Sequence, residues 1–222
     1  MIRFFDIFLS GLALIILSPL FILVMVILKL TGEGEIFFRQ KRVGKNKKDI
    51  YLFKFATMFK NSENTGTKTI TIKNDPRILP VGRFLRDFKI NELPQLINIF
   101  KGEMSFIGPR PLTQETFSLY SEEIQNKIVT IEPGLSGVGS IVFRNEEKIL
   151  SGGNDSLVIY KNYISPYKGD LESWFTENRN LYTYFALIFL TVLIVLNLKP
   201  KLIFKIYKDL PEPNKNIQNF LE

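Results

Sequence analysis

The hydropathy pattern of the chain is dominated by one apolar run near each end. Residues 7–28 form an uncharged run long enough for a helix that crosses a bilayer. Ser18-Pro19 interrupts this run near its middle, and because proline removes a backbone donor and clashes with the preceding turn, we expect a kink there. Two alternatives stay open: a kinked helix that spans the membrane, which the length favours, or a re-entrant helix that returns to the face it entered.

The second run, residues 181–198, is also uncharged and predicts either a transmembrane helix or a helix lying in the membrane interface. Basic residues follow both runs. After the first come Arg39, Lys41, Arg42, Lys45, Lys47 and Lys48, and after the second come Lys199, Lys201, Lys205 and Lys208. Because basic segments are retained in the cytoplasm and attract anionic headgroups, the first cluster predicts a cytoplasmic position beside the membrane.

Between the runs, the pattern predicts two extended segments followed by helices. Residues 36–44 are expected to be extended and to enter a turn, and residues 49–58 alternate like a strand with one aromatic face. Residues 61–74 are polar and predict a loop beside the site, whereas residues 113–130 show a helical pattern. We interpret residues 145–180 as mixed helix and loop.

A short helix is expected from Glu92 to Lys101. Asn91 is a good helix cap, and a proline is tolerated in the first turn. Apolar residues then recur at helical spacing, which predicts one buried face, and Lys101-Gly102 supplies a stop. The face consists of Leu93, Leu96, Ile97 and Phe100.

Composition narrows the chemistry that the chain can perform. Among 222 residues there is no cysteine and no histidine, which excludes disulfides, thiolate nucleophiles and imidazole catalysis. The net charge of +7 suits nucleic acid, an anionic membrane or phosphorylated substrates, and the apolar runs favour a membrane over nucleic acid. Phosphoryl transfer fits this inventory because it depends on positioning and charge neutralisation.

Residues 74–111 concentrate arginines, carboxylates, prolines and glycines. Arginines precede the expected helix start at Glu92, and another follows within Gly108-Pro109-Arg110-Pro111. Since a helix N-terminus offers free N–H donors and partial positive charge, this segment predicts either a phosphate site or a solvated basic surface with a capped helix. The preceding arginines are Arg77, Arg83 and Arg86.

Three ordered motifs, DPRILPVGRFLR, INELPQLINIFKGEMSFIGPRP and PGLSG, resemble the bacterial sugar transferase family, whose members are monotopic polyprenyl-phosphate phosphoglycosyl transferases. The looser resemblance runs from the N-terminus to about residue 200. It implies transfer of a phospho-sugar from a nucleotide diphosphate sugar, by default a uridine diphosphate sugar, to polyprenyl phosphate. The nucleoside monophosphate is released and Mg²⁺ is expected.

The resemblance also assigns roles to residues. It implies that Asn91 and Glu92 occupy the catalytic acidic pair, and that Glu92 and Glu103 are the metal-binding carboxylates. Arg77 has two readings, a phosphate ligand or a structural partner of Asp75. The side chains and loops expected to bind the donor's phosphates and nucleotide are Lys54, Arg77, Arg86, Pro109, Arg110 and Gly134.

This chain departs from the family pattern at the position of the expected nucleophile. The family has aspartate where this chain has Asn91, and an amide is a poor nucleophile. Three explanations stay open: Glu92 takes over as nucleophile, Asn91 positions substrates for direct attack by the lipid phosphate, or the chain is a silent membrane scaffold for glycan assembly. Ala56 also replaces a family arginine, and residues 138–144 differ from the usual tryptophan-containing continuation.

Taken together, the sequence predicts an α+β, mainly helical monotopic membrane enzyme with a small β-hairpin and interfacial helices. The resemblance favours a re-entrant first run, and a second run lying in the interface, because a spanning one would export its lysines. We expect a re-entrant helix over residues 1–30, a catalytic domain over 31–180 on the cytoplasmic face of the bacterial inner membrane, and an interfacial helix with a basic tail over 181–222. The expected partners are the nucleotide sugar, polyprenyl phosphate and membrane lipids, without nucleic acid.

Overall fold

The computed structural model of the protein describes residues 1–60, 62, 75–144, 146, 156–196, 202–213 and 217–218. Helices form most of this part, and its strands pair into two small sheets, β1–β2 antiparallel and β3–β4 parallel. This confirms the α+β prediction of a mainly helical protein with a small hairpin. The predicted loop over residues 61–74 lies outside the described residues, apart from Ser62.

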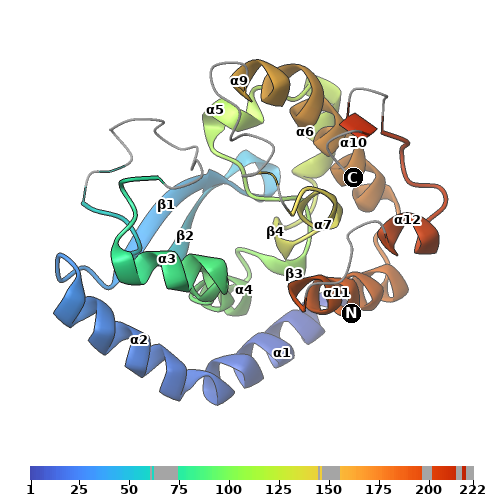
Figure 1. The fold of residues 1–222 in the computed structure, drawn as a ribbon. Helices are drawn as coiled ribbons and strands as arrows, with labels where there is room; N and C mark the ends of the chain where they lie inside the picture. Colours follow the sequence, from blue (N-terminus) through green and yellow to red (C-terminus); the bar gives the residue numbers. More distant parts are fainter. Residues whose placement is uncertain are drawn as a thin grey trace.

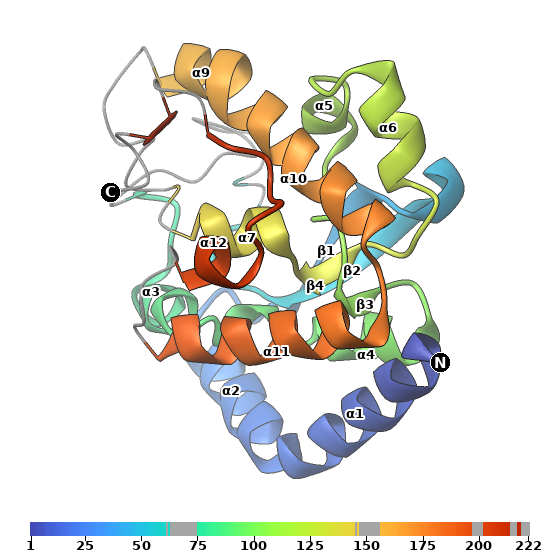
Figure 2. The same ribbon diagram turned by 90° about the vertical axis from the view of Figure 1, so that its right-hand side faces the viewer.

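The first apolar run folds into two helices, α1 (Ile2–Ile16) and α2 (Ser18–Thr31), whose axes differ by 61°. The break falls at Leu17, and Pro19 lies in the first turn of α2, where a missing N–H costs nothing. The kink predicted at Ser18-Pro19 is therefore confirmed. Figures 1 and 2 show the pair as a V whose bend lies farthest from the rest of the chain, while both outer ends return to it.

The outward faces of this pair are apolar and exposed. No single helix in the described part of the chain is long and apolar enough to cross a membrane, whereas α1 and α2 together meet that criterion by length and composition. Large apolar side chains left in solvent by the fold are typical of an interaction surface. On these helices they include Phe4, Phe8, Leu12, Ile15, Ile16, Ile22, Leu23, Val26 and Leu30.

Two charged residues fasten α1 to the middle of the molecule. Asp6 is 2% exposed, and its Oδ1 atom accepts hydrogen bonds from the Ser105 hydroxyl (3.0 Å), the Phe106 amide (3.0 Å) and the Tyr184 hydroxyl (2.8 Å). Arg3 donates hydrogen bonds to the carbonyl oxygens of Ile99 and Phe100. These residues belong to the last turn of the helix α4 (Gln95–Lys101), where a cation is favourable.

The hairpin consists of β1 (Phe37–Val43) and β2 (Asp49–Phe55), joined by the turn η1 (Lys45–Lys47). The antiparallel pairing sets Arg42 opposite Ile50 and Phe38 opposite Lys54, which confirms both predicted extended segments. The tip of the hairpin lies far from α1 and α2 in both views (Figures 1 and 2). Its backbone bonds to residue 129 instead, and Lys45 pairs with Glu132 at 2.8 Å. The tip lysines thus lie away from the apolar helix pair, and the expected cytoplasmic position of the basic cluster beside the membrane stays a prediction.

The central motif folds as α3 (Pro80–Asp87), a short turn η3 (Ile90–Glu92) and α4 (Gln95–Lys101). The helix predicted from Glu92 therefore begins later, at Gln95, and Asn91 does not cap it, because its side chain makes no capping hydrogen bond. The predicted stop is confirmed, since Gly102 ends α4 with a φ of +93°.

The predicted buried face of this helix is only partly correct. Leu96 and Ile99 are buried with Gln95 and Asn98, whereas Phe100 is 49% exposed on the side facing α1. Asn98 is fully buried and joins α4 to β2: its amide nitrogen donates to the Tyr51 carbonyl at 2.8 Å, and its oxygen accepts from the Phe53 amide at 3.0 Å.

The parallel pair β3 (Ser105–Ile107) and β4 (Gly134–Ser136) holds the two glycine- and proline-rich loops together. The Gly134 amide donates to the Pro109 carbonyl at 2.8 Å, and the Gly108 amide donates to the Ser136 carbonyl at 3.0 Å. A Cβ atom at residue 134 would lie 2.1 Å from the Gly108 nitrogen, so glycine is needed where the two backbones approach.

Helices cover the side of these strands that faces away from α1 and α2 (Figure 2). The pattern over 113–130 forms two helices, α5 (Gln114–Phe117) and α6 (Glu122–Ile128), and α7 (Val138–Val142) follows β4. The predicted mixed region gives α9 (Ser156–Ile159), the π-helical turn η4 (Tyr160–Ile164) and α10 (Ser165–Glu177), and residues 145 and 147–155 lie outside the description. The short α12 (Leu202–Ile206) is followed by a segment that contacts α10, where the Trp174 indole donates to Asp209 at 2.9 Å.

The second apolar run forms α11 (Leu181–Val195), which Asn180 caps by accepting from the Thr183 amide at 3.0 Å. One face, including Tyr184, Leu187 and Leu190, is buried in the main core, while Phe189 and Val192 are exposed. The helix therefore lies along the molecule, close to the start of α1 (Figure 2).

We expect Asp6→Ala to destabilise the protein by about 2–4 kcal/mol, because it leaves buried donors on β3 and α11 without an acceptor. Asp6→Asn keeps one acceptor and should lose less, and Tyr184→Phe, which removes a single donor, should lose about 1 kcal/mol. Thermal unfolding in detergent measures all three. An unchanged midpoint for Asp6→Ala would contradict the fastening role of this carboxylate.

Candidate active site

A small pocket gathers polar residues from three separate parts of the sequence. Arg42 comes from β1 and Lys54 from β2, Glu92 ends the turn η3, and Arg110 lies in the loop after β3. The hairpin, α4 and the β3–β4 pair meet here at the centre of the ribbon (Figure 1). The complete lining is Arg42, Leu52, Lys54, Glu92, Gln95, Arg110, Pro111, Gly134 and Leu135.

Glu92 is the acidic residue among the described residues that line this pocket. Burial by itself would raise the pKa of Glu92, but the positive charges of Lys54, Arg110, Lys89 and Arg86 outweigh it and bring the pKa below its ordinary value. The carboxylate is therefore ionised at neutral pH.

The cations of the pocket repel one another in a partly buried space. Burial, with repulsion from Arg42, Arg110 and Arg86, lowers the pKa of Lys54 to about 7, even though Glu92 attracts its proton. Burial and the charge of Arg110 likewise lower the pKa of Arg42 to about 10. A cluster with more positive than negative charge is poised to accept an anion such as phosphate.

Asn91 lies beside this pocket without lining it. Its side chain is 6% exposed, and its buried Oδ1 atom has no hydrogen-bond partner among the residues that the structure describes. An unpartnered buried polar atom is costly, which is typical of functional positions rather than of ordinary packing. Of the predicted catalytic pair, the structure therefore brings only Glu92 into the pocket.

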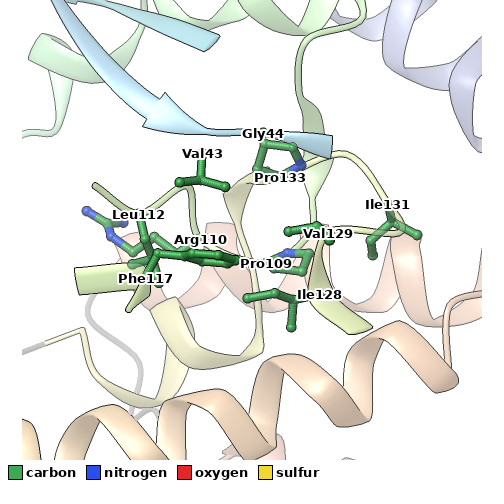
Figure 3. Close-up of a pocket in the computed structure, with 10 residues that line it drawn as sticks. All are labelled: Val43, Gly44, Pro109, Arg110, Leu112, Phe117, Ile128, Val129, Ile131 and Pro133. Atoms are coloured by element: carbon green, nitrogen blue, oxygen red, sulfur yellow. The ribbon is translucent and has the colours of Figure 1, made fainter. Parts of the chain in front are cut away.

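Some of the other predicted binding residues line or influence the pocket, and the rest lie outside it. Arg110 and Gly134 line the pocket, and the charge of Arg86, on α3, acts on both Lys54 and Glu92. Pro109 lies on the opposite side of the same loop, in a small apolar pocket where the guanidinium of Arg110 extends away from the apolar lining (Figure 3). Arg77 instead forms a two-pronged pair with the buried Asp75 (2.9 and 2.6 Å), so its structural reading is the one that the fold supports.

Glu103, the second predicted metal ligand, does not line the pocket. Its Oε2 atom accepts a hydrogen bond from Asn98 at 2.6 Å, which places it at the end of α4. In the described part of the chain, no group of three or more acidic residues is arranged to hold a metal ion. The donor set fits Mg²⁺ only in the mode where one carboxylate, Glu92, shares the ion with substrate phosphates and water.

The structure also reveals residues that the sequence analysis missed. The sequence places Arg42 in the basic cluster after the first apolar run and does not single out Gln95. Both residues line the pocket. Behind Arg110, α10 buries Lys168 and Glu172, which are 6% and 2% exposed. A lysine and a glutamate four positions apart are typical of an exposed ion pair on a helix, so the sequence carried no signal of their burial.

An apolar helix pair next to a cationic pocket built around one carboxylate is the arrangement expected of a transferase that handles phosphorylated substrates. The profile described as bacterial sugar transferase matches residues 1–198 of the chain. With the motifs of the pocket inside this match, the chain belongs to the bacterial sugar transferase family.

Curated relatives are similar over much of the chain. The exopolysaccharide production protein ExoY of Rhizobium meliloti is 30% identical over 204 residues, which cover 86% of this chain and 83% of that protein. The undecaprenyl-phosphate galactose phosphotransferase of Salmonella typhimurium is 33% identical over 209 residues, covering 87% of this chain and 40% of the relative. The UDP-glucose:undecaprenyl-phosphate glucose-1-phosphate transferase of Escherichia coli is 38% identical over 138 residues, or 61% and 30% of the two chains.

Proposed function

We propose that this enzyme transfers a sugar 1-phosphate from a nucleotide diphosphate sugar, by default a UDP-sugar, to polyprenyl phosphate. The bond between the β-phosphorus and the bridging oxygen breaks, and the nucleoside monophosphate leaves with that oxygen. The lipid phosphate oxygen forms the new bond, which gives polyprenyl-diphosphate-sugar, a first membrane-bound intermediate of glycan assembly. The observation that carries the proposal is the convergence of Arg42, Lys54 and Arg110 on the carboxylate of Glu92 in one pocket.

In this proposal the cations hold the donor's diphosphate and neutralise the charge that develops on it. Arg110 offers a fork of donors that matches phosphate oxygens, and Lys54 supplies a compact charge. These interactions stabilise the transition state of phosphoryl transfer, in which little other chemistry is required from the protein. Glu92 would hold Mg²⁺, which would supply further neutralisation of the diphosphate's charge when bound.

Glu92 is proposed as the nucleophile that accepts the phospho-sugar from the donor and passes it to the lipid. Three features support it over direct attack by the lipid: it is ionised, it lines the pocket, and Asn91 is enclosed beside it. The transfer then consists of two displacements at the same phosphorus atom, the first releasing the nucleoside monophosphate and the second releasing Glu92.

The apolar surfaces of the fold support a position at the membrane that supplies the lipid. The bend of α1 and α2 exposes apolar side chains beside α3 and α4, and we propose that the pair enters and leaves the bilayer on its cytoplasmic face. The exposed face of α11 would then lie in the interface, which suits a helix with one face buried in protein.

The alternative is a silent membrane scaffold, which the amide of Asn91 at the expected nucleophile position favours. The two are separated by nucleoside monophosphate release from detergent-solubilised protein with Mg²⁺ and a panel of nucleotide sugars, with and without polyprenyl phosphate. Lipid-dependent release identifies the transferase and its sugar. Binding of a donor with no release under any condition identifies the scaffold.

Glu92→Gln should abolish turnover, with a fall of at least about 10³-fold, because the amide can neither attack phosphorus nor balance the cations. Folding should be nearly intact, since the residue lies at the edge of a short turn. A burst of nucleoside monophosphate without lipid, up to one equivalent per enzyme, is expected in the wild type and absent in the variant. Normal turnover by Glu92→Gln would remove this residue from the mechanism.

Binding of the nucleotide sugar should weaken as the pH rises above about 7, because Lys54 loses its proton there and the bound diphosphate favours its charged form. With one proton linked to binding, the dissociation constant rises by up to about tenfold per pH unit. Lys54→Arg stays charged and should bind equally well from pH 6.5 to 8.5. Calorimetric titration checks this, and the same fall in both proteins would assign the titration to another group.

A further inference from the structure

Behind the pocket, a carboxylate on α10 approaches the loop that carries Arg110. The Oε1 atom of Glu172 accepts a hydrogen bond from the backbone amide of Arg110 at 3.4 Å, and the amide of Gly139, in α7, is a second donor to the same carboxylate. With 2% exposure, Glu172 is enclosed by the two loops that it joins.

The sequence around Arg110 makes this contact unusually consequential. Pro109 and Pro111 have no backbone N–H, so the Arg110 amide is the sole backbone donor between residues 109 and 111. The flanking main-chain anchors are the Pro109 carbonyl, which accepts from the Gly134 amide at 2.8 Å, and the Leu112 carbonyl, which accepts from the Val43 amide at 2.9 Å. Those anchors hold the neighbours of Arg110, whereas Glu172 is the partner of the Arg110 amide itself and contributes to the orientation of its backbone.

The start of α7 also leaves space for this carboxylate. A Cβ atom at residue 139 would lie 2.6 Å from Oε1 of Glu172, and one at residue 137 would lie 3.4 Å from Oε2. Glycine at 139 therefore leaves room for this carboxylate in its present position, and a larger residue there would require the end of the Glu172 side chain to move. Oε2 is buried and has no hydrogen-bond partner in the described part of the chain, so the carboxylate is kept at a cost in stability.

Charged neighbours do not neutralise Glu172 directly. The ammonium of Lys168, one turn earlier on α10, bonds both carboxylate oxygens of Glu146 at 2.6 Å instead. The other titratable groups that act on this region are Arg110 on its loop, Tyr160 in η4 and Tyr120 between α5 and α6. Burial raises the pKa of Glu172 to about 7, against the opposing effects of the Arg110 amide, Lys168 and the Arg110 charge.

We propose that Glu172 is a positioning residue for donor binding, which sets the Arg110 loop against the start of α7, at Gly137 and Gly139, so that the guanidinium faces the donor's diphosphate. It touches no substrate and acts through Arg110. The inference rests on the proposed function, in which Arg110 binds that diphosphate. It adds a determinant of donor affinity on a helix outside the motifs of the pocket.

Kinetics of nucleoside monophosphate release test the role. Glu172→Ala should raise the KM for the nucleotide sugar by about 10–100-fold, the range for losing hydrogen bonds to a charged group, with a smaller change in kcat. Glu172→Gln retains an acceptor and should recover part of this loss. The matched control is Glu177→Gln on the same helix, an exposed residue whose partner is the partly buried Lys127, and it should leave KM unchanged.

Coupling to Arg110 separates positioning from a general structural role. Arg110→Ala by itself should raise KM, and adding Glu172→Ala to it should have little further effect, because both act through one interaction with the donor. Effects that multiply would overturn the inference, as would a wild-type KM in Glu172→Ala.

Stability gives a second, independent readout. A carboxyl group whose pKa is raised on folding stabilises the protein fully below its unfolded pKa, and this contribution is lost as the pH rises through about 7. Glu172→Gln should therefore gain stability relative to the wild type between pH 5 and 8 while its donor binding is weaker. Parallel losses of stability and binding would instead indicate a structural role.

Hydrogen exchange tests the contact even if the wild type releases no nucleotide with any donor. Among residues 109–111 only the Arg110 amide can exchange, so the difference in deuterium uptake between overlapping peptides that differ by this tripeptide reports that single amide. Exchange there should be faster in Glu172→Ala than in the wild type and unchanged in Glu177→Gln. Unchanged exchange in Glu172→Ala would overturn the inference by itself, whereas absent turnover with faster exchange would count against the proposed function alone.

Discussion

The concentration of positive charge around a single carboxylate is the constraint on which the rest of the structure depends. Arg42, Lys54 and Arg110 repel one another, and burial makes that repulsion stronger. Such a cluster persists only if its backbone is held rigidly, and the surrounding elements do this: the hairpin through Asn98, and the Arg110 loop through Gly134 and the buried α10. An anionic substrate reduces the repulsion between these cations, so its binding lowers the electrostatic free energy of the pocket.

Local chemistry along the chain predicted the elements well, because kinks, alternation and glycine stops are encoded within a few residues. The break at Ser18-Pro19 and the end of α4 at Gly102 are examples. The buried face of α4 was partly wrong since apolar periodicity does not distinguish a side chain facing the core from one facing α1, as Phe100 does. The turn η3 also delays the helix, which shifts its phase relative to the pattern.

The site was predictable to the extent that its residues lie in the motifs that carry the family resemblance. Glu92, Arg110 and Gly134 meet as expected, but Arg42 reaches them only because the hairpin turns its strand toward α4. Convergence of this kind depends on strand register and is not written in local spacing. Glu103 shows the converse, since a carboxylate in the right motif is bound by Asn98 and kept apart from Glu92's pocket. That Glu92 and Glu103 bind one metal ion together stays a prediction, which sequence proximity alone does not establish.

The bonds of Asp6 and Arg3 make the apolar helix pair part of the catalytic unit. Oδ1 of Asp6 satisfies donors on β3 and α11, and Arg3 satisfies the final carbonyl groups of α4, so α1 contributes polar atoms to the interior as well as apolar atoms to the surface. Removing the pair to obtain a water-soluble fragment would strip acceptors and donors from three elements at once. A soluble version of this enzyme therefore requires polar substitutions on the exposed face of α1 and α2, with Arg3 and Asp6 left unchanged.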